Sequence, residues 1–393
     1  MLLSISLILI VGLWNGWVCE KLKLPSLIGM LFTGIILGPY VLSLIDKNIL
    51  DISSDIRKIA LIIILTRAGL GLDLQSLKKI GRPAILMCFI PATFELLGML
   101  LIAPKLMGLS ILEAALLGSV LAAVSPAVVV PRMVKLMEEG YGTKEGIPQL
   151  ILAGASVDDV FVIVLFSTFS SMIQGSKISL MSFVNIPFSI ILGIIVGLLF
   201  GCALALFFKK VHIRDTIKVI IVLCISLLLV VIEDSLKTPI TFSALIAIMF
   251  IGCGLQKKNE SVSKRLSLKY GKLWVVAEVF LFVLVGASVN ISYLGQVGFS
   301  AVCMILGALC FRMIGVFLCL LGTKLNLKEK LFAMIAYTPK ATVQAAIGSI
   351  PLTLGFSCGE VVLTVAVLAI VLTAPLGAFA IDLLYKRLLN KGN

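Results

Sequence analysis

Two neighbouring carboxylates, Asp158 and Asp159, lie in a stretch from Leu152 to Phe166 that is otherwise apolar. The stretch has the length and composition of a helix that crosses a lipid bilayer. A carboxylate at the middle of a bilayer costs roughly 2.5–3.5 kcal/mol on insertion scales, so charges at this depth usually belong to an ion or proton pathway. The pair is therefore the candidate centre of the chemistry.

A carboxylate removed from water is most stable when it carries a proton or binds a cation. The proton and the cation compete for the carboxylate. If the site faces the other side of the membrane only after binding one of them, the competition gives obligatory exchange. Hard oxygen ligands suit Na⁺ or Li⁺, and the candidate donors are Asp158, Asp159, the Ser156 hydroxyl and backbone carbonyls near Ser125. Ser156 is equally well explained as a hydroxyl that bonds its own helix. Successive helical residues point about 100° apart, so the two carboxylates are expected to differ in role.

Other charges and two prolines form a repeated pattern. Glu95 and Arg312 each lie well inside an apolar stretch, with an aromatic residue before the charge and a glycine three residues after it. The next apolar stretch contains a hydroxyl-proline step in both cases: Ser125-Pro126, followed by Pro131, and Thr338-Pro339, followed by Lys340 and Gln344. Proline disrupts the preceding turn and frees backbone carbonyls, which lipid cannot satisfy. The matched breaks predict an inverted repeat whose broken helices line an ion site.

The composition is that of an integral membrane protein, because 60% of the 393 residues are hydrophobic, 13% are charged and mean hydropathy is +1.17. We therefore predict an all-α polytopic fold. About thirteen apolar spans satisfy the length needed to cross about 30 Å of hydrocarbon. They run over residues 2–18, 25–45, 56–74, 83–103, 110–130, 147–173, 183–208, 216–235, 239–255, 273–294, 299–322, 331–354 and 360–383.

The basic residues predict the orientation. Most of the 33 Lys and Arg fall on one side of the predicted topology, including Lys78, Lys79 and the Lys386-Arg387 tail. Such a bias marks the cytoplasmic side, so we expect the amino terminus outside and the carboxyl terminus in the cytoplasm. The other side holds few basic residues, Lys177 and Lys237 among them. The net charge of +13 is explained by this topology and not by nucleic acid, because no basic patch is interleaved with aromatic residues.

A resident metal or cofactor is not expected. His212 is the only histidine and lies in a basic loop, so a zinc site or a catalytic triad has almost no residues to use. The nine cysteines show no Cys-x-x-Cys spacing and are typical of small apolar residues within spans.

Four segments together resemble a known family. These are Ser125-Pro-Ala-Val-Val-Val-Pro131, Gly154-Ala-Ser-Val-Asp-Asp-Val160, Leu281-Phe-Val-Leu-Val-Gly-Ala-Ser288 and Thr338-Pro-Lys-Ala-Thr-Val-Gln344. They resemble sodium/proton antiporters of the monovalent cation/proton antiporter superfamily, and in particular its NHA-like branch, which has two adjacent aspartates where electroneutral exchangers have Asn-Asp. The likeness extends over nearly the whole chain.

The resemblance implies a core that moves like an elevator against a dimerisation scaffold, in a homodimer of the bacterial-type plasma membrane. The core corresponds to residues 83–173 and 299–383, and the scaffold to residues 1–74 and 183–294. By motif match Asp159 is the cation-binding aspartate, Glu95 and Arg312 are a paired acid and base, and Lys340 is the lysine of the second broken helix. Well-known two-aspartate antiporters have Lys in place of Arg312, and Arg cannot lose its proton, so the stoichiometry does not carry over.

Two pairings are expected on electrostatic grounds. Glu95 and Arg312 should form an ion pair, and Lys340 should neutralise Asp158 when no cation is bound, because each is too costly in hydrocarbon without a partner. A K⁺/H⁺ antiporter or a K⁺ efflux-type transporter is the main alternative function. A cation channel is less favoured because these charges would trap the ion. An intramembrane aspartyl protease needs aspartates on facing helices, which adjacent residues do not provide.

Overall fold

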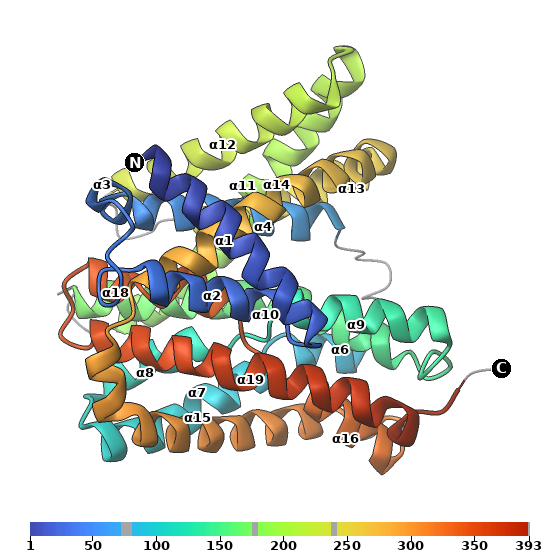
Figure 1. The fold of residues 1–393 in the computed structure, drawn as a ribbon. Coiled ribbons are helices and arrows are strands. Elements are labelled where there is room, and N and C mark those ends of the chain that lie inside the picture. The colour runs from blue at the N-terminus through green and yellow to red at the C-terminus, as the bar shows by residue number, and fades with distance from the viewer. Residues whose placement is uncertain (72–80, 175–179, 237–241, 392–393) are drawn as a thin grey trace. The chain divides into compact units, whose positions relative to one another are not determined.

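The structure, a computed structural model, describes residues 1–71, 81–174, 180–236 and 242–391. Over these ranges the regular elements are α-helices, and the one β feature is an isolated bridge between Tyr141 and Lys391. The predicted all-α fold is confirmed (Figure 1). The helices are α1 Leu2–Lys21, α2 Ser26–Leu37, α3 Lys47–Asp51, α4 Ser53–Gly71, α6 Arg82–Met87, α7 Ile90–Met107, α8 Ile111–Leu121, α9 Pro126–Glu139, α10 Ile147–Ile173, α11 Leu180–Lys210, α12 Asp215–Ser235, α13 Ala244–Lys258, α14 Glu260–Ala287, α15 Ile291–Cys319, α16 Leu327–Ala336, α17 Thr342–Ile347, α18 Ile350–Thr353 and α19 Gly359–Leu388.

Among the described residues, nine helical runs are long and apolar enough to cross a membrane. Most predicted spans fall on one helix or on consecutive shorter helices, with ends that differ by several residues. The span over 273–294 fits least well, because α14 begins at Glu260 and ends at Ala287 and α15 begins at Ile291. Of the basic residues that predict the orientation, Lys78, Lys79, Lys177 and Lys237 lie outside the described residues. The orientation stays a prediction.

The chain divides into two compact units. The first contains Met1–Ser54, Asp73–Gln174 and Phe282–Asn393, and the second contains Asp55–Leu72 and Gly175–Leu281. Both predicted core segments, 83–173 and 299–383, fall in the first unit. The assignment of a moving core and a dimer scaffold stays a prediction.

Two helices of the first unit are broken where proline follows a hydroxyl residue. One break separates α8 from α9, and Pro126 is the first residue of α9, a position where its missing N–H costs nothing. The other separates α16 from α17 and contains Pro339. Both α8 and α16 begin with a capping box, Ser110 with Glu113 and Asn326 with Glu329, so the two repeats start alike.

A third break was not predicted. The span over 83–103 was expected to be one helix, but it consists of α6 and α7, separated at Cys88 and Phe89. Pro91, the second residue of α7, explains the difference. It has no N–H to donate to the Met87 carbonyl four residues earlier, so the helical ladder cannot pass through this point. Glu95 lies one turn further along α7.

In the second unit α11 packs closely on α13. The stripe formed by Gly193, Gly197 and Gly201 faces α13, and a Cβ on Gly197 would lie 2.3 Å from the Ala247 carbonyl oxygen. Only glycine allows the two backbones this approach.

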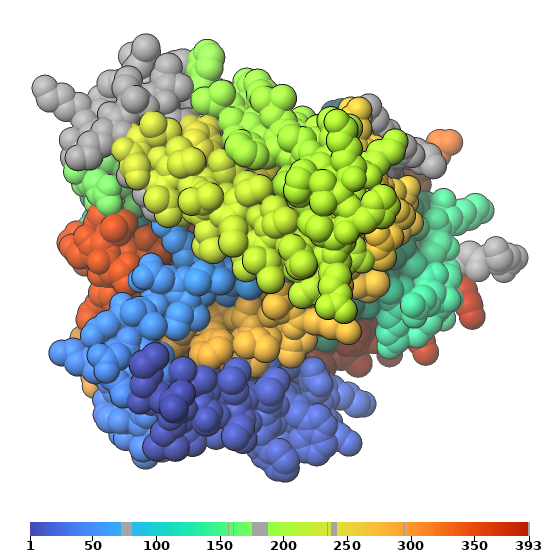
Figure 2. Space-filling model, turned by 90° about the horizontal axis from the view of Figure 1, so that it is seen from above, coloured from blue at the N-terminus to red at the C-terminus, as the bar shows by residue number. Residues whose placement is uncertain are grey.

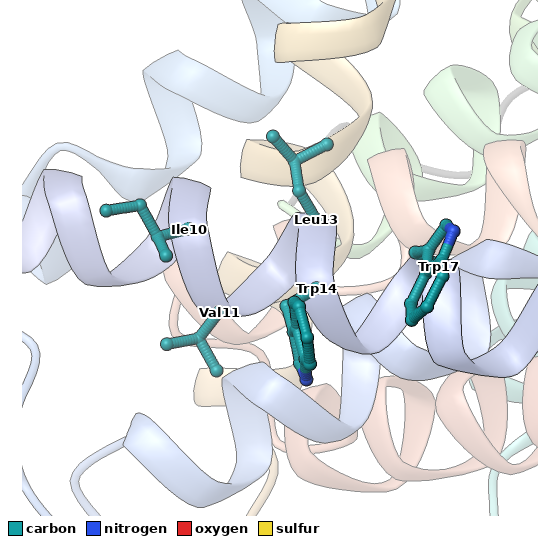
Figure 3. Close-up of a pocket in the computed structure, with 5 residues that line it drawn as sticks. All are labelled: Ile10, Val11, Leu13, Trp14 and Trp17. Atoms are coloured by element: carbon teal, nitrogen blue, oxygen red, sulfur yellow. The ribbon is translucent and has the colours of Figure 1, made fainter.

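The outer side of α1 is apolar and open. Figure 2 shows the first residues, in dark blue, as a continuous strip on the surface of the first unit. Figure 3 shows a shallow pocket lined by Ile10, Val11, Leu13, Trp14 and Trp17. No charged side chain lines it, so it has no ligand for an ion, and the candidate site lies elsewhere.

Candidate functional site

Five charged side chains from four parts of the first unit meet in its interior. Asp158 lies on α10, Glu95 on α7, Arg312 on α15 and Lys340 in the break before α17, and all four are fully buried. Asp159 is partly buried as a residue, but its Oδ1 oxygen is enclosed. The sequence predicted each of these residues as a member of the site, and the structure brings them together. Their roles in binding stay predictions.

Asp158 is held through one of its oxygens. Its Oδ2 accepts hydrogen bonds from Arg312 Nη2 at 2.8 Å and from the Val124 amide at 2.8 Å. The other oxygen, Oδ1, is buried without a hydrogen-bond partner. The carboxylate is thus fixed by a charge-assisted bond through Oδ2, whereas Oδ1 is enclosed without a hydrogen bond.

Glu95 bridges the two buried cations. Its Oε2 accepts from Arg312 Nη1 at 2.9 Å and from Lys340 Nζ at 2.8 Å, and its Oε1 lies 2.7 Å from Lys340 Nζ. The expected ion pair between Glu95 and Arg312 is present. The expected partner of Lys340 was wrong, because Lys340 bonds Glu95 and it is Arg312 that bonds Asp158. The long, forked guanidinium reaches both carboxylates at once, whereas an ammonium is a single point charge.

Three backbone carbonyls at the break between α8 and α9 accept hydrogen bonds from buried side chains of the site. The Leu121 carbonyl accepts from Lys340 Nζ at 2.5 Å, the Ala122 carbonyl accepts from Arg312 Nη1, and the Ala123 carbonyl accepts from Gln344 Nε2 at 3.0 Å. The break therefore leaves no costly unpaired carbonyl at these three positions. These carbonyls near Ser125 were candidate cation ligands, but each already has a donor.

The two breaks cross at Ser125. Its amide donates to the Pro339 carbonyl at 2.7 Å, which joins the first break directly to the second. Its hydroxyl is buried and has no partner. Thr338 bonds the Ile335 carbonyl within its own turn, and Pro131 lies inside α9 without ending it.

Among the buried oxygens that lack hydrogen-bond partners in the described part of the chain, three belong to candidate cation ligands: Ser125 Oγ, Asp158 Oδ1 and Asp159 Oδ1. Glu95 Oε1 and Gln344 Oε1 also lack a hydrogen bond, although Glu95 Oε1 lies 2.7 Å from Lys340 Nζ. Asp159 has no ion-pair partner within the described ranges. Ser156 lies in α10, but its side chain is outside the part of the chain that the structure describes. Side-chain oxygens of this kind can bind a small hard cation. The described residues hold no cluster of three or more His, Cys, Asp or Glu that would suit a transition metal.

Sequence reasoning missed Tyr337. Its carbonyl accepts from Arg312 Nε at 2.6 Å, and its ring lies under the guanidinium with 4.9 Å between the Cζ atom and the ring centroid. A tyrosine in an apolar span is typical of ordinary core packing. A usable signal would have been its position directly before the Thr338-Pro339 break.

The comparison with known families decides the identity. Residues 5–386 match the family described as sodium/hydrogen exchanger, transmembrane. The chain belongs to the sodium/hydrogen exchanger family. The exchanger is 36% identical over 387 residues to human sodium/hydrogen exchanger 9B2, a match that covers 94% of this chain and 70% of the relative. Human sodium/hydrogen exchanger 9B1 is 34% identical over 386 residues and covers 94% and 73%.

A solved structure shares the exchanger's fold. The sodium proton antiporter MjNhaP1 from Methanocaldococcus jannaschii, determined at pH 8, has a TM-score of 0.85 with 22% sequence identity, over 98% of this chain and 97% of that chain. At this identity the likeness concerns the fold alone. Family membership makes the exchanger a transporter and not an enzyme, so the aspartyl protease alternative is excluded.

Proposed function

We propose that this exchanger moves Na⁺ or Li⁺ against H⁺ by competitive binding at Asp158 and Asp159. The observation that carries the proposal is the charge balance of the buried cluster. Three carboxylates, Asp158, Asp159 and Glu95, face two cations, Arg312 and Lys340. When all five are ionised, one negative charge remains, and either one proton or one monovalent cation cancels it.

In the cation-loaded state, Asp159 and the free oxygen of Asp158 bind the ion, with the Ser125 hydroxyl as a further ligand. In each of these three residues a buried side-chain oxygen has no hydrogen-bond partner. Loss of the cation leaves Asp159 without a counter-charge, so this carboxylate takes up the proton. Asp158 remains ionised throughout because Arg312 stays bonded to it and cannot release its proton.

The same balance favours a one-for-one exchange that moves no net charge. Lys340 keeps its proton in this scheme because its ammonium nitrogen lies 2.8 Å from Glu95 Oε2 and 2.7 Å from Glu95 Oε1. Electrogenic exchange would require Lys340 to leave Glu95 and release that proton. Purified protein on a solid-supported membrane, with cation and proton gradients of equal size and opposite direction, tests this scheme. A transport current under these conditions would contradict electroneutral exchange.

The finer classification is also a proposal. We place the chain in the NHA-like, two-aspartate branch, on the support of its Asp158-Asp159 pair and its similarity to the 9B exchangers. The elevator movement of residues 83–173 and 299–383, the homodimer and the bacterial-type plasma membrane are proposed from the same resemblance. The outside amino terminus is proposed from the distribution of Lys and Arg.

Proteoliposomes with an imposed pH gradient test the function. Addition of Na⁺ or Li⁺ should dissipate the gradient, and K⁺ should do so far less. Asp159→Asn should abolish exchange and cation-induced thermal stabilisation, because an amide cannot hold the proton and is a poorer ligand. Asp51→Asn, which changes an exposed carboxylate at the end of α3, is the matched control and should behave as wild type. Wild-type exchange by Asp159→Asn would overturn the assignment.

A further inference from the structure

The Met87 carbonyl lies at the break between α6 and α7. Its ordinary helical donor would be the amide of residue 91, but Pro91 has none. The Tyr337 hydroxyl supplies the missing donor at 3.0 Å, across 250 residues of sequence. Both groups are buried, where an unpaired carbonyl is costly. One tyrosine hydroxyl therefore completes the broken helix that carries Glu95.

The rest of Tyr337 holds Arg312. The Tyr337 carbonyl accepts from Nε, and the aromatic ring lies against the guanidinium. These two contacts leave Nη1 and Nη2 facing Glu95 and Asp158. An aromatic face attracts a cation and also fixes the plane of a guanidinium. Tyr337 thus touches Arg312 from one end and the α6–α7 break from the other.

A third contact reaches the helix that carries the aspartates. Gly154 lies one turn before Asp158 on the same face of α10. A Cβ on Gly154 would lie 2.5 Å from the Tyr337 hydroxyl oxygen and 2.9 Å from Met87 Cβ. The hydroxyl therefore has no space to move toward α10, and its position depends on the absence of a side chain at residue 154.

We propose that Tyr337 is a positioning residue for exchange, which sets the distance between Arg312 and Asp158 by joining the α6–α7 break, α10 and α15. The inference rests on the proposed function of Asp158 and Asp159. Without the hydroxyl, α7 and Glu95 shift, and Arg312 holds the Asp158 carboxylate less firmly. Asp158 then retains a proton more readily, and the cation must displace it.

Tyr337→Phe tests the hydroxyl alone, because it keeps the ring and the carbonyl. We expect KM for Li⁺ to rise by about two- to thirtyfold, the range in which residues that act through a contact network alter coupling. The pH profile of exchange should move to higher pH. Tyr337→Leu, which also removes the ring, should move both further in the same direction.

Tyr270→Phe is the matched control. Tyr270 is equally buried and its hydroxyl donates to the Val219 carbonyl at 3.2 Å, but it belongs to the second unit and contacts none of the five charges. A merely structural role would make both phenylalanine variants lower the melting temperature and leave KM and the pH profile unchanged. That result would overturn the inference.

Gly154→Ala decides the matter if Tyr337→Phe cannot be purified. The added methyl group displaces the same hydroxyl, so KM and the pH profile should shift as above, whereas Gly298→Ala, which meets nothing within 4 Å, should leave both unchanged. Wild-type kinetics in Gly154→Ala would also overturn the inference. If the wild type exchanges ions and the variants have unchanged kinetics, the positioning role of Tyr337 is refuted and the proposed function stands. If the wild type does not exchange ions, the proposed function is refuted and this inference with it.

Discussion

Removal of Arg312 should be among the most damaging single changes in the protein. Arg312→Gln breaks two charge-assisted bonds, to Asp158 and to Glu95, and uncovers the Ala122 and Tyr337 carbonyls. A bond to a charged group contributes about 1.5–3 kcal/mol, and breaking one side of a buried ion pair costs about 3–5 kcal/mol. We expect Arg312→Gln to lower the free energy of unfolding by about 3–5 kcal/mol. Glu95→Gln should lower it by a similar amount, because Lys340 loses its partner.

The double variant Glu95→Gln/Arg312→Gln should be less damaging than the two single losses together. It removes one acid and one base, so the cluster keeps one net negative charge, and the remaining Lys340 and Asp158 carry opposite charges. Coupling between residues in one network is about 0.5–3 kcal/mol. We expect about 2–3 kcal/mol here, since the uncovered carbonyls remain uncovered in the double variant.

Unfolding in mixed micelles of increasing SDS content, followed by circular dichroism, measures the four free energies. A second cycle on Glu260 and Lys264 serves as control, since these side chains form an ion pair of 2.7 Å but are well exposed. Exposed pairs of this kind are weak, so no comparable coupling should appear there. Additivity of the Glu95 and Arg312 losses to within about 0.3–0.5 kcal/mol would refute the reasoning.

Three further outcomes are expected. Ser125→Ala should raise KM for Na⁺ and Li⁺ without lowering the melting temperature, because the Ser125 hydroxyl bonds no other group; an unchanged KM would remove it from the cation site. Gly377→Ala should lower the free energy of unfolding by about 1–3 kcal/mol, because its Cβ would lie 2.5 Å from Pro339 Cγ. Gly298→Ala is the control and should not destabilise the protein, because its Cβ would have no atom within 4 Å. Equal melting temperatures for the two variants would contradict the prediction. Burial raises the pKa of the Cys358 thiol to about 11, with Glu113 adding to the shift, so maleimide should label this thiol slowly at pH 7. Rapid labelling of the folded protein at pH 7 would show that the thiol is not enclosed.

The buried charges and the two proline breaks could be predicted from sequence because both are costly in lipid unless they serve a site. The pairing of these charges was only half predictable. Glu95 and Arg312 occupy matching places in the repeats, but the partner of Lys340 depends on where the breaks cross, at Ser125 and Pro339. No local pattern specifies that point.

The break at Met87 and the role of Tyr337 were missed for a related reason. Pro91 lies inside the predicted span over 83–103, where a proline can simply kink a helix, so it did not by itself indicate that α6 ends at Met87 and α7 begins at Ile90. The donor that completes the break lies 250 residues away. The Tyr337 hydroxyl can be identified as the donor to the Met87 carbonyl only in the folded structure, where the partner of each backbone group is known.

The order of the five charges along the chain has a consequence for synthesis. Glu95, Asp158 and Asp159 leave the ribosome long before Arg312, which lies 217 residues after Glu95. Carboxylates can enter the bilayer neutral by holding a proton, whereas a guanidinium cannot shed its charge. The acids can therefore wait in the membrane uncharged, and the bases arrive last, when partners are in place. The reverse order would ask the nascent chain to hold an unpaired guanidinium in hydrocarbon until its acids were made.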